Sequence, residues 1–293
     1  MMGASVPGVI LMRLRPWLGV GAVGAAVLLA PPAATLAADF PPVSAPPMQA
    51  PAVVAAPPPY SWYGLFVGIQ GGYGFGGKAI SYTPNASYAA LFASGAVPSP
   101  VADDPAGFVG GITYGTNFQF GRLVVGSESD WSYSDIRKSE TRGPLTGFST
   151  QVTAEQRLKY FSTTRARAGV LMTDHWLLYG TGGLASGGVE GSSAFNLVAP
   201  AACAGAGNCP VGSRSKTLWG WAAGGGIEFA NGPWSLKVDY LYYDLGKLNY
   251  SVADPTLPAG VITASHRFSG SVVRAGLNYR FNWTLFDLVL GRR

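Results

Sequence analysis

In several segments of the chain two charged residues are separated by a single residue. In a β-strand this spacing places the two side chains on the same face. Such a face could hold ion pairs inside a protein or line a pore that selects solutes by charge. The candidate residues are Glu128, Asp130, Arg165, Arg167, Glu228, Lys237, Asp239, Arg274 and Arg280. With five bases and four acids the set is nearly neutral, so mutual pairing is the expected arrangement.

Groups suited to catalysis are few. The histidines His175 and His266 are far apart in sequence, and neither metal-ligand spacing nor a nucleophile motif accompanies them. The glycine-rich segment 71–77 precedes no expected helix that could bind a phosphate. An acid–base pair of His266 with Asp103 or Asp104 is the one enzymatic arrangement we consider. We therefore expect neither an enzyme nor a cofactor, and keep an active site at the rim of the fold as an alternative.

Low charge and abundant glycine restrict the class of protein. Charged residues make up 12% of the 293 residues, about half the usual share, and 41 residues are glycine. A soluble globular protein carries more surface charge, and a disordered chain has fewer aromatic residues than the 12% found here. An all-β or membrane-embedded chain remains.

The N-terminal region has the organisation of an export signal. Arg13 and Arg15 precede an apolar run over 18–30, and Thr35-Leu36-Ala37 is typical of a cleavage site, with Met12 as an alternative start. We predict a signal peptide over 1–37 and a Pro-rich periplasmic linker over 38–60. An uncleaved anchor is the alternative, although the run is short for a spanning helix. The mature chain is only mildly basic and has no basic cluster, which argues against nucleic acid as a partner.

From residue 61 onward, apolar and polar residues alternate in eight segments, each long enough to cross a bilayer as a strand. Tight turns near Gly121, Asp174 and Gly232 connect pairs of segments, and the other connections are longer. The segments are 61–75, 107–120, 122–136, 156–172, 176–190, 215–230, 234–250 and 265–281. The pattern predicts an all-β fold, an eight-stranded antiparallel up-and-down transmembrane β-barrel over 61–281, with a periplasmic tail over 282–293.

The bulky rings indicate which face of each strand meets lipid. An eight-stranded barrel encloses room for small and medium side chains, whereas the uncharged faces carry many aromatic residues. We therefore expect a charged lumen and two aromatic girdles outside, with Leu158 facing lipid and Lys159 facing the lumen. A soluble lipocalin-like barrel is the alternative. The predicted lipid-facing aromatic residues are Tyr73, Phe118, Trp131, Tyr160, Trp219, Trp234, Tyr240, Tyr279 and Phe281.

Cys203 and Cys209 lie in the third long connection. Because an exported chain enters an oxidising compartment, we expect a disulfide between them, worth roughly 2–3 kcal/mol through loop closure. Zinc binding and free thiols are the alternatives.

A series of short motifs runs through the chain. Its members are Ala38-Asp39-Phe40, Trp62-Tyr63-Gly64-Leu65-Phe66-Val67-Gly68, Gly72-Tyr73-Gly74, Gly107-Phe108-Val109-Gly110-Gly111, Gly126-Ser127-Glu128-Ser129-Asp130-Trp131, Leu177-Leu178-Tyr179-Gly180-Thr181-Gly182-Gly183-Leu184-Ala185, Val238-Asp239-Tyr240 and Arg274-Ala275-Gly276-Leu277-Asn278-Tyr279-Arg280-Phe281. In this order they resemble the alphaproteobacterial outer-membrane immunogenic proteins, porin-like surface antigens related to small OmpA-type barrels. The resemblance covers about 38–281 and implies an eight-stranded barrel in a Gram-negative outer membrane, with a structural or surface-antigen role. Such barrels usually end on an aromatic residue, whereas here further residues follow Phe281.

Two functions fit a charged lumen. Because buried charges must be paired, we expect a salt-bridge network that closes the barrel, with pairs between neighbouring strands such as Glu128 with Arg165 and Lys237 with Glu228. A narrow porin for small solutes is the alternative. The expected partners are outer-membrane lipid, lipopolysaccharide and the barrel-assembly machinery, and peptidoglycan or host surfaces are further candidates.

Overall fold

A computed structural model of the chain describes residues 60–102, 104–145, 150–197, 209–255 and 259–284, together with Asp287 and Gly291. The sheet lies within the unit Pro57–Arg293. The predicted signal peptide over 1–37 and all but the last residue of the predicted linker lie outside the described residues. Both remain predictions.

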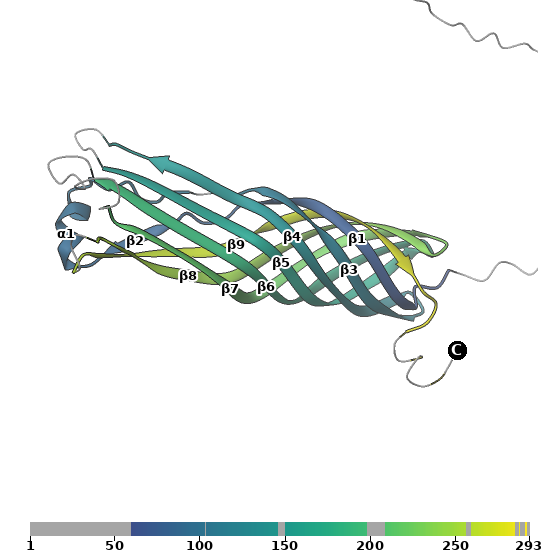
Figure 1. The fold of residues 1–293 in the computed structure, drawn as a ribbon. Helices are drawn as coiled ribbons and strands as arrows, with labels where there is room; N and C mark the ends of the chain where they lie inside the picture. Colours follow the sequence, from purple (N-terminus) through teal and green to yellow (C-terminus); the bar gives the residue numbers. More distant parts are fainter. Residues whose placement is uncertain are drawn as a thin grey trace, which may run out of the picture. The chain divides into compact units, whose positions relative to one another are not determined.

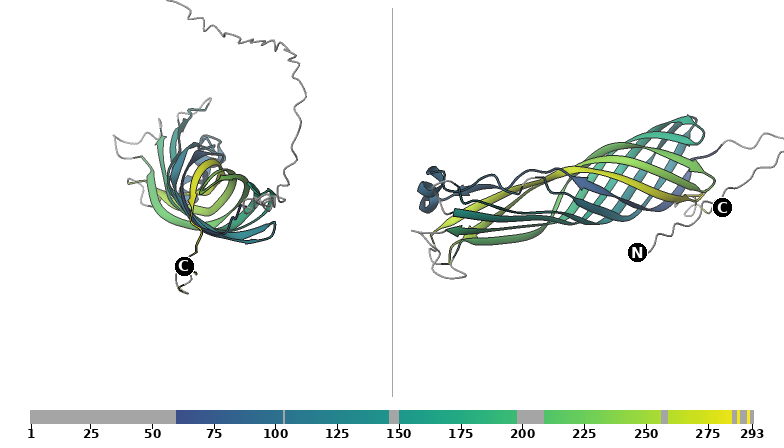
Figure 2. Two further views of the ribbon diagram at one scale, coloured as in Figure 1. Left: turned by 90° about the vertical axis from the view of Figure 1, so that its right-hand side faces the viewer. Right: turned by 90° about the horizontal axis from the view of Figure 1, so that it is seen from above.

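Antiparallel strands form a closed ring (Figures 1 and 2). Each long strand pairs with the next along the chain, and β1 pairs with β9 to close the ring, as Tyr73 opposite Val273 shows. The elements are β1 (Gly64–Phe75), β2 (Ser81–Pro84), α1 (Ala86–Ala93), β3 (Gly107–Phe120), β4 (Leu123–Arg142), β5 (Thr150–Thr173), β6 (Trp176–Leu197), β7 (Val211–Asn231), β8 (Trp234–Ala253) and β9 (Val261–Arg280). The predicted eight-stranded antiparallel up-and-down barrel is confirmed, with β2 as an additional short strand.

Two-residue turns close one end of the barrel. They lie between β3 and β4, between β5 and β6, and between β7 and β8. Gly121 and Gly232 have φ values of 61° and 58°, a conformation that glycine adopts without steric cost. This short-turn end is therefore built as the sequence predicts.

At the opposite end the strands run further than predicted. The fourth predicted segment begins at residue 156, but β5 begins at Thr150 and has 24 residues. Likewise β4 continues to Arg142 rather than residue 136. Because about 9–11 residues suffice to cross a bilayer, the strands continue well beyond the membrane. Much of what was predicted as long loops is instead barrel wall.

The first predicted loop contains ordered elements. Ser81 of β2 pairs with Ser265 of β9, on the part of β9 that lies beyond its pairing with β1. Helix α1 follows, with Asn85 as its N-cap accepting a hydrogen bond from the Ser87 N–H. The helix has eight residues, and no helix in the described ranges is long and apolar enough to cross a membrane. Figure 1 shows β2 and α1 at the end of the barrel opposite the C-terminus.

Bulges divide the barrel into two parts, which we call the membrane half and the outer half. The register shifts between Tyr133 and Ile136 on β4, between Leu158 and Tyr160 on β5, and between Asp244 and Lys247 on β8. The membrane half runs from the short turns to these bulges, and the outer half lies beyond them. On β5 and β8 the bulge reverses which residues face inward. Leu158 is therefore buried inside and Lys159 is exposed outside, the reverse of the prediction.

The two halves should respond differently to a charge on their outer surface. Val238 on β8 is 47% exposed, within the membrane half, and Ser139 on β4 is exposed in the outer half. Val238→Arg places a cation in lipid and is expected to lower the unfolding free energy by about 2–4 kcal/mol. Ser139→Arg, the matched control, meets water and should have little effect. Denaturant titration of the barrel in phospholipid vesicles measures both, and equal losses would contradict this division.

Candidate functional site: the barrel interior

The interior of the membrane half contains a network of buried ion pairs. Eight charged side chains converge there, and their side chains are 0–3% exposed. The members are Glu128, Asp130, Arg165, Arg167, Glu228, Lys237, Asp239 and Arg274. The network contains four acids and four bases and is therefore neutral. Buried charges need such pairing because an unpaired charge in the interior is very costly.

Glu128 on β4 lies at the centre of this network. Its Oε1 accepts hydrogen bonds from Arg165 Nη2 at 2.9 Å and from Lys237 Nζ at 2.6 Å. Its Oε2 lies 3.4 Å from Arg167 Nη1. Lys237 is on β8, which does not neighbour β4 in the sheet, so this pair crosses the lumen. Lys237 is directly opposite Glu228 in the β7–β8 ladder, as the sequence predicts, but its ammonium pairs with Glu128 across the barrel.

Asp130 and Asp239 are held by two arginines. Arg165 Nη2 and Arg274 Nη1 donate to Asp130 Oδ2 at 2.9 and 3.2 Å, and the Thr163 hydroxyl donates to the same oxygen at 2.6 Å. Arg274 also forms a two-pronged contact with Asp239 on the neighbouring strand. Since β4 and β9 are not adjacent, Arg274 is a second bridge across the lumen.

Glu228 completes the network near the short-turn end. Arg167 Nη2 donates to its Oε2 at 2.6 Å, while Asn278 Nδ2 donates to its Oε1 at 3.1 Å. The Ser235 hydroxyl also donates to Oε1. The guanidinium of Arg167 lies 4.1 Å above the ring of Tyr179, in the range of a cation–π contact.

Arg280, the ninth predicted member, lies apart from this network. Its guanidinium stacks 4.2 Å from the ring of Tyr60 and 5.8 Å from the ring of Trp62, and it donates to the Gly232 carbonyl. Arg280 shares the inward face of β9 but sits at its end, where the lumen opens. Arg280 therefore keeps the predicted inward face, but no ion pair among the described residues joins it to the carboxylates of the network.

A small apolar cluster closes the short-turn end below the charges. Trp62 is 1% exposed, and its Nε1 donates to the Asp174 carbonyl at 3.0 Å. Its backbone N–H donates to Gln119 Oε1 at 2.6 Å. The first predicted strand segment begins at residue 61, but β1 begins at Gly64, so Trp62 precedes the strand. The cluster consists of Trp62, Val124, Leu171, Leu177, Tyr179 and Ala230, with Tyr60 packed against it.

The outer half of the barrel is filled by a hydrophobic core. Phe161 and Phe195 are fully buried there, and Phe161 packs on Tyr243 with ring centroids 4.9 Å apart. The core also includes Ile80, Leu158, Val189, Leu245, Leu248, Tyr250, Val252 and Ile262. Sequence reasoning missed this core because it assumed that the inward face is polar along the whole strand. The signal was present beyond the bulge in β8, where Leu248, Tyr250 and Val252 alternate with polar residues.

Hydrogen bonds tie β2 and α1 to this core. The Tyr82 hydroxyl lies 2.8 Å from Ser193 Oγ, which lies 2.7 Å from the Tyr250 hydroxyl, so the buried polar atoms of three strands satisfy one another. The Tyr88 hydroxyl of α1 donates to Asp254 Oδ2 at 2.7 Å. Leu91 and Phe92 of the same helix pack against the core. Helix α1 thereby covers part of the outer end of the barrel.

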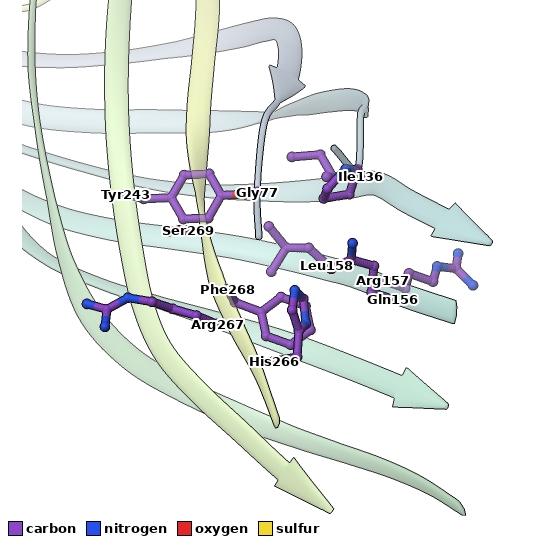
Figure 3. Close-up of a pocket in the computed structure, with 11 residues that line it drawn as sticks. Gly77, Ile136, Gln156, Arg157, Leu158, Tyr243, His266, Arg267, Phe268 and Ser269 are labelled. Carbon is purple, nitrogen blue, oxygen red and sulfur yellow. The ribbon is translucent and has the colours of Figure 1, made fainter. Parts of the chain in front are cut away.

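His266 is buried in the outer half rather than exposed at the rim. It is 1% exposed and stacks on Phe268 with ring centroids 4.0 Å apart. It lines a cavity of about 10 Å³, which is room for about one water molecule; the lining residues are drawn in Figure 3. Asp104 is exposed, and no hydrogen bond among the described residues joins it to this ring, while Asp103 lies outside the described residues. The imagined pair of His266 with Asp104 is therefore not formed.

His266 should make folding stability depend on pH. Burial lowers the pKa of His266 to about 4, against a smaller opposing effect from the Lys78 backbone. Between pH 6.5 and about 4 the unfolded chain binds a proton that the folded chain does not, so stability falls as the pH decreases. The loss attributable to this group is up to about 3 kcal/mol. Denaturant titrations at pH 7 and pH 4 should show a smaller loss for His266→Gln than for the unmodified chain, and equal losses would contradict the prediction.

The predicted lipid-facing rings lie on the outside of the barrel. Trp219 is the most exposed of them, at 72%. Three of the rings, Phe118, Tyr160 and Phe281, are partly buried. Neighbouring groups cover part of their surface, as the ring of Tyr63 does for Phe118. The remaining exposed rings of the predicted set are Tyr73, Trp131, Trp234, Tyr240 and Tyr279. An apolar outer surface of this extent on the membrane half requires lipid around it.

Cys209 is disulfide-bonded, whereas its predicted partner Cys203 lies outside the described residues. The pairing of the two remains a prediction. Within the described ranges, no group of three or more His, Cys, Asp or Glu side chains could hold a metal ion. What the described interior displays is charge pairing.

A closed ring of antiparallel strands with an apolar outer surface and paired charges inside is the architecture of a transmembrane barrel of the outer-membrane type. The chain belongs to the outer-membrane protein β-barrel domain family, whose model matches residues 43–281. It is 35% identical over 224 residues to the 31 kDa outer-membrane immunogenic protein of Brucella melitensis, covering 76% of this chain and 85% of that protein. It is also 28% identical to the 25 kDa outer-membrane immunogenic protein of Brucella abortus, covering 80% and 86%. The expected family is confirmed, and the protein resides in the outer membrane.

Solved structures of other outer-membrane proteins are similar in outline. OprG from Pseudomonas aeruginosa is 15% identical with a TM-score of 0.44, covering 76% of this chain and 98% of that one. Ail of Yersinia pestis is 14% identical with a TM-score of 0.26, covering 72% and 99%.

Proposed function

We propose that the protein is a closed, non-catalytic barrel that carries a folded surface structure on the outer membrane. The observation that supports this most is the filling of the lumen along its length. Trp62 and its cluster occupy the short-turn end, the ion pairs occupy the membrane half, and the hydrophobic core occupies the outer half. A solute would have to displace all three layers.

The outer half of the barrel supports the proposed role at the cell surface. Its strands extend the barrel wall beyond the membrane, and α1 packs on its core. With the short turns facing the periplasm, this half presents a rigid surface with structured connections to the exterior. The names of the Brucella relatives, immunogenic proteins of the outer membrane, agree with such exposure.

The short-turn end offers a surface for partners on the periplasmic side. The chain beyond β9 still follows the wall, because Phe281 N–H donates to the Leu65 carbonyl at 2.7 Å and Leu65 N–H donates to the Trp283 carbonyl at 2.8 Å. The predicted tail therefore begins as an extension of the sheet. We propose that the barrel-assembly machinery reads this aromatic segment, and that peptidoglycan and host surfaces are further partners of the two ends.

Planar-bilayer recording of the full chain tests the closed lumen. We expect no steady conductance from protein whose insertion is verified by heat-modifiable migration on a gel. A steady channel would contradict closure and favour the narrow porin. If such a channel appeared, Glu128→Gln should change its charge selectivity, because Glu128 lies where the lumen charges meet.

A further inference from the structure

One sector of the wall of the outer half is built from a connection rather than from long strands. β1 ends at Phe75 and β3 begins at Gly107, whereas β4 continues to Arg142 and β9 also runs on beside it. The connection between β1 and β3 fills the sector that these two strands leave open, with β2 lying along β9. We call its residues 76–102 and 104–106 the cover.

Few backbone pairs join the cover to the rest of the barrel. β2 adds a ladder of four residue pairs to β9. One isolated bridge joins the two arms of the cover at Ile80 and Val101, and another joins Ala106 to Arg137 on β4. By contrast, β5 and β6 pair along almost their whole length. The cover is therefore the part of the outer half that we expect to open at the lowest free energy.

His266 lies where the cover meets the wall. Gly77 and Pro105 of the cover line the same small cavity as His266, and Gln156 of β5 lines it too (Figure 3). The Gln156 side chain ties the two parts together, because its Nε2 donates to the Ala102 carbonyl of the cover. A change at this histidine thus acts directly on the contact between cover and wall.

The ring of His266 is poorly placed to carry a charge. It is 1% exposed, and neither ring nitrogen makes a hydrogen bond of ordinary geometry with a described residue, although the Lys78 backbone lies near enough to favour the protonated ring to a small extent. The charged groups among the described lining residues are Arg157 and Arg267, and both are cations. Room for about one water molecule is too little to hydrate an imidazolium.

The other titratable groups packed around this ring do not gain a proton at moderately acidic pH. Burial raises the pKa of Tyr243 on β8 and of Tyr82 on β2, so both phenols stay neutral. Burial opposes ionisation of Asp244 on β8, but the hydrogen bond from Arg267 outweighs it and lowers the pKa of that carboxyl. From β5, Arg157 contributes a permanent cation.

The acids of β4 and of the cover do not compensate a charge on the ring. On β4, the hydrogen bond from Arg142 lowers the pKa of Glu140, so this carboxylate stays ionised at pH 5. Asp135 on the same strand lies near partly exposed arginines. Asp104 of the cover is exposed, and Asp103 lies outside the described residues. Protonation of the histidine therefore conflicts with its position under the cover.

We propose that His266 is an acid-sensitive latch, in which proton uptake by the ring favours a state where the cover has left the wall. Water reaches the ring in that state and hydrates the imidazolium, and the proton comes from the solvent. Release exposes Ile80 and Val101, which are fully buried under the closed cover, at the outer end of the barrel. The latch goes beyond the closed lumen proposed above, because the ion pairs of the membrane half stay in place.

The direction of the pH effect follows from the two states of the ring. Burial lowers the pKa of His266 under the closed cover to about 4, whereas the ordinary value is 6.5. Because the open state binds the proton more tightly, the closed state is fully favoured above pH 6.5 and loses its advantage as the pH falls towards 4. Between pH 7.5 and pH 5 the opening equilibrium should rise roughly thirtyfold.

Hydrogen exchange of the full chain in phospholipid nanodiscs tests the latch at pH 7.5 and pH 5. After correction for the intrinsic pH dependence of exchange, the amides of Ile80 and Val101 should lose protection roughly thirtyfold, while those around Glu128 keep theirs. His266→Gln should remove this loss. His175→Gln is the matched control, because it removes the other of the two histidines at the short-turn end and should leave the loss in place.

A titration of the rings provides a second measurement if His266→Gln fails to fold, as judged by heat-modifiable migration. Since the chain has two histidines, nuclear magnetic resonance of isotope-labelled rings gives two curves, and His175→Gln assigns them. The His266 curve should have the same midpoint as the loss of protection in the cover. A ring that is protonated at pH 5 under a fully protected cover would overturn the latch.

Other outcomes also contradict the proposal. Unchanged protection of the cover at pH 5 would show that the histidine does not control it. The same loss in His266→Gln would assign the effect to carboxylates, and loss throughout the barrel would show global rather than local opening. If Asp103→Asn abolished the pH effect, the ring would have a carboxylate partner, and the latch as proposed would be wrong.

Discussion

Arg165→Ala is expected to lower the free energy of unfolding by about 3–5 kcal/mol, among the largest effects of any single substitution in this barrel. Arg165 is fully buried and donates to Glu128 and to Asp130, each at 2.9 Å. Its removal leaves four carboxylates in a water-poor interior with only three cations to pair with them. Urea titration of the barrel in lipid vesicles, followed by tryptophan fluorescence, measures the loss.

Arg137→Ala is the matched control for this substitution. Arg137 also lies near a carboxylate, but its side chain is 60% exposed and 3.6 Å from Asp135. An exposed pair of this kind contributes about 0–1 kcal/mol, so the control should unfold almost as the unmodified chain does. Similar stabilities for Arg165→Ala and Arg137→Ala would show that the network does not stabilise the barrel.

A double variant distinguishes lost pairing from lost packing. Glu128→Ala combined with Arg165→Ala removes opposite charges together, so its loss should be smaller than the sum of the single losses. Planar-bilayer recordings of Arg165→Ala should also show no steady conductance. The reason is that the hydrophobic core of the outer half is still in place. A channel in this variant alone would show that the ion pairs are the only barrier.

Phe195→Ala is expected to have an effect of similar size but in the other half of the barrel. Phe195 on β6 is fully buried, with its ring centroid 5.0 Å from that of Tyr82 and 6.5 Å from that of Phe92. Truncating a buried phenylalanine costs about 3–5 kcal/mol through lost burial and the cavity left behind. Because the ring joins β6 to β2 and α1, the loss should concentrate in the outer half.

Hydrogen exchange locates this loss. In Phe195→Ala the amides of β2 and α1 should exchange faster, while those around Glu128 keep their protection. Leu184→Ala on the same strand is the control, since Leu184 is 65% exposed on the lipid side and lipid fills the vacated space. Faster exchange throughout the barrel would contradict the independence of the two halves.

The layered interior has a physical rationale. Ion pairs in a low-dielectric interior are strong only when geometry and hydrogen bonding are complete, and water competes with them wherever it enters. Here Trp62 closes one side of the network and the hydrophobic core closes the other. In the proposed closed lumen these apolar layers would exclude water from the charges, while Lys237 and Arg274 join opposite walls of the barrel.

The sequence alone determined the class of fold and the set of lumen charges. Alternation of apolar and polar residues requires strands, and the lack of a further long apolar run leaves a barrel as the way to satisfy the backbone in lipid. Since side chains alternate strictly along a strand, Glu128 with Asp130 and Arg165 with Arg167 necessarily share a face. The bulky rings on the other face then decide which side meets lipid.

Only the tertiary structure decided the partners of these charges and the nature of the outer half. Lys237 meets Glu128 across the lumen because the curvature of the ring brings β8 towards β4, which strand adjacency in sequence does not encode. The bulge between Leu158 and Tyr160 reverses the alternation, so Leu158 enters the core and Lys159 leaves it. A bulge depends on pairing with the neighbouring strand, and a single strand read alone carries no register.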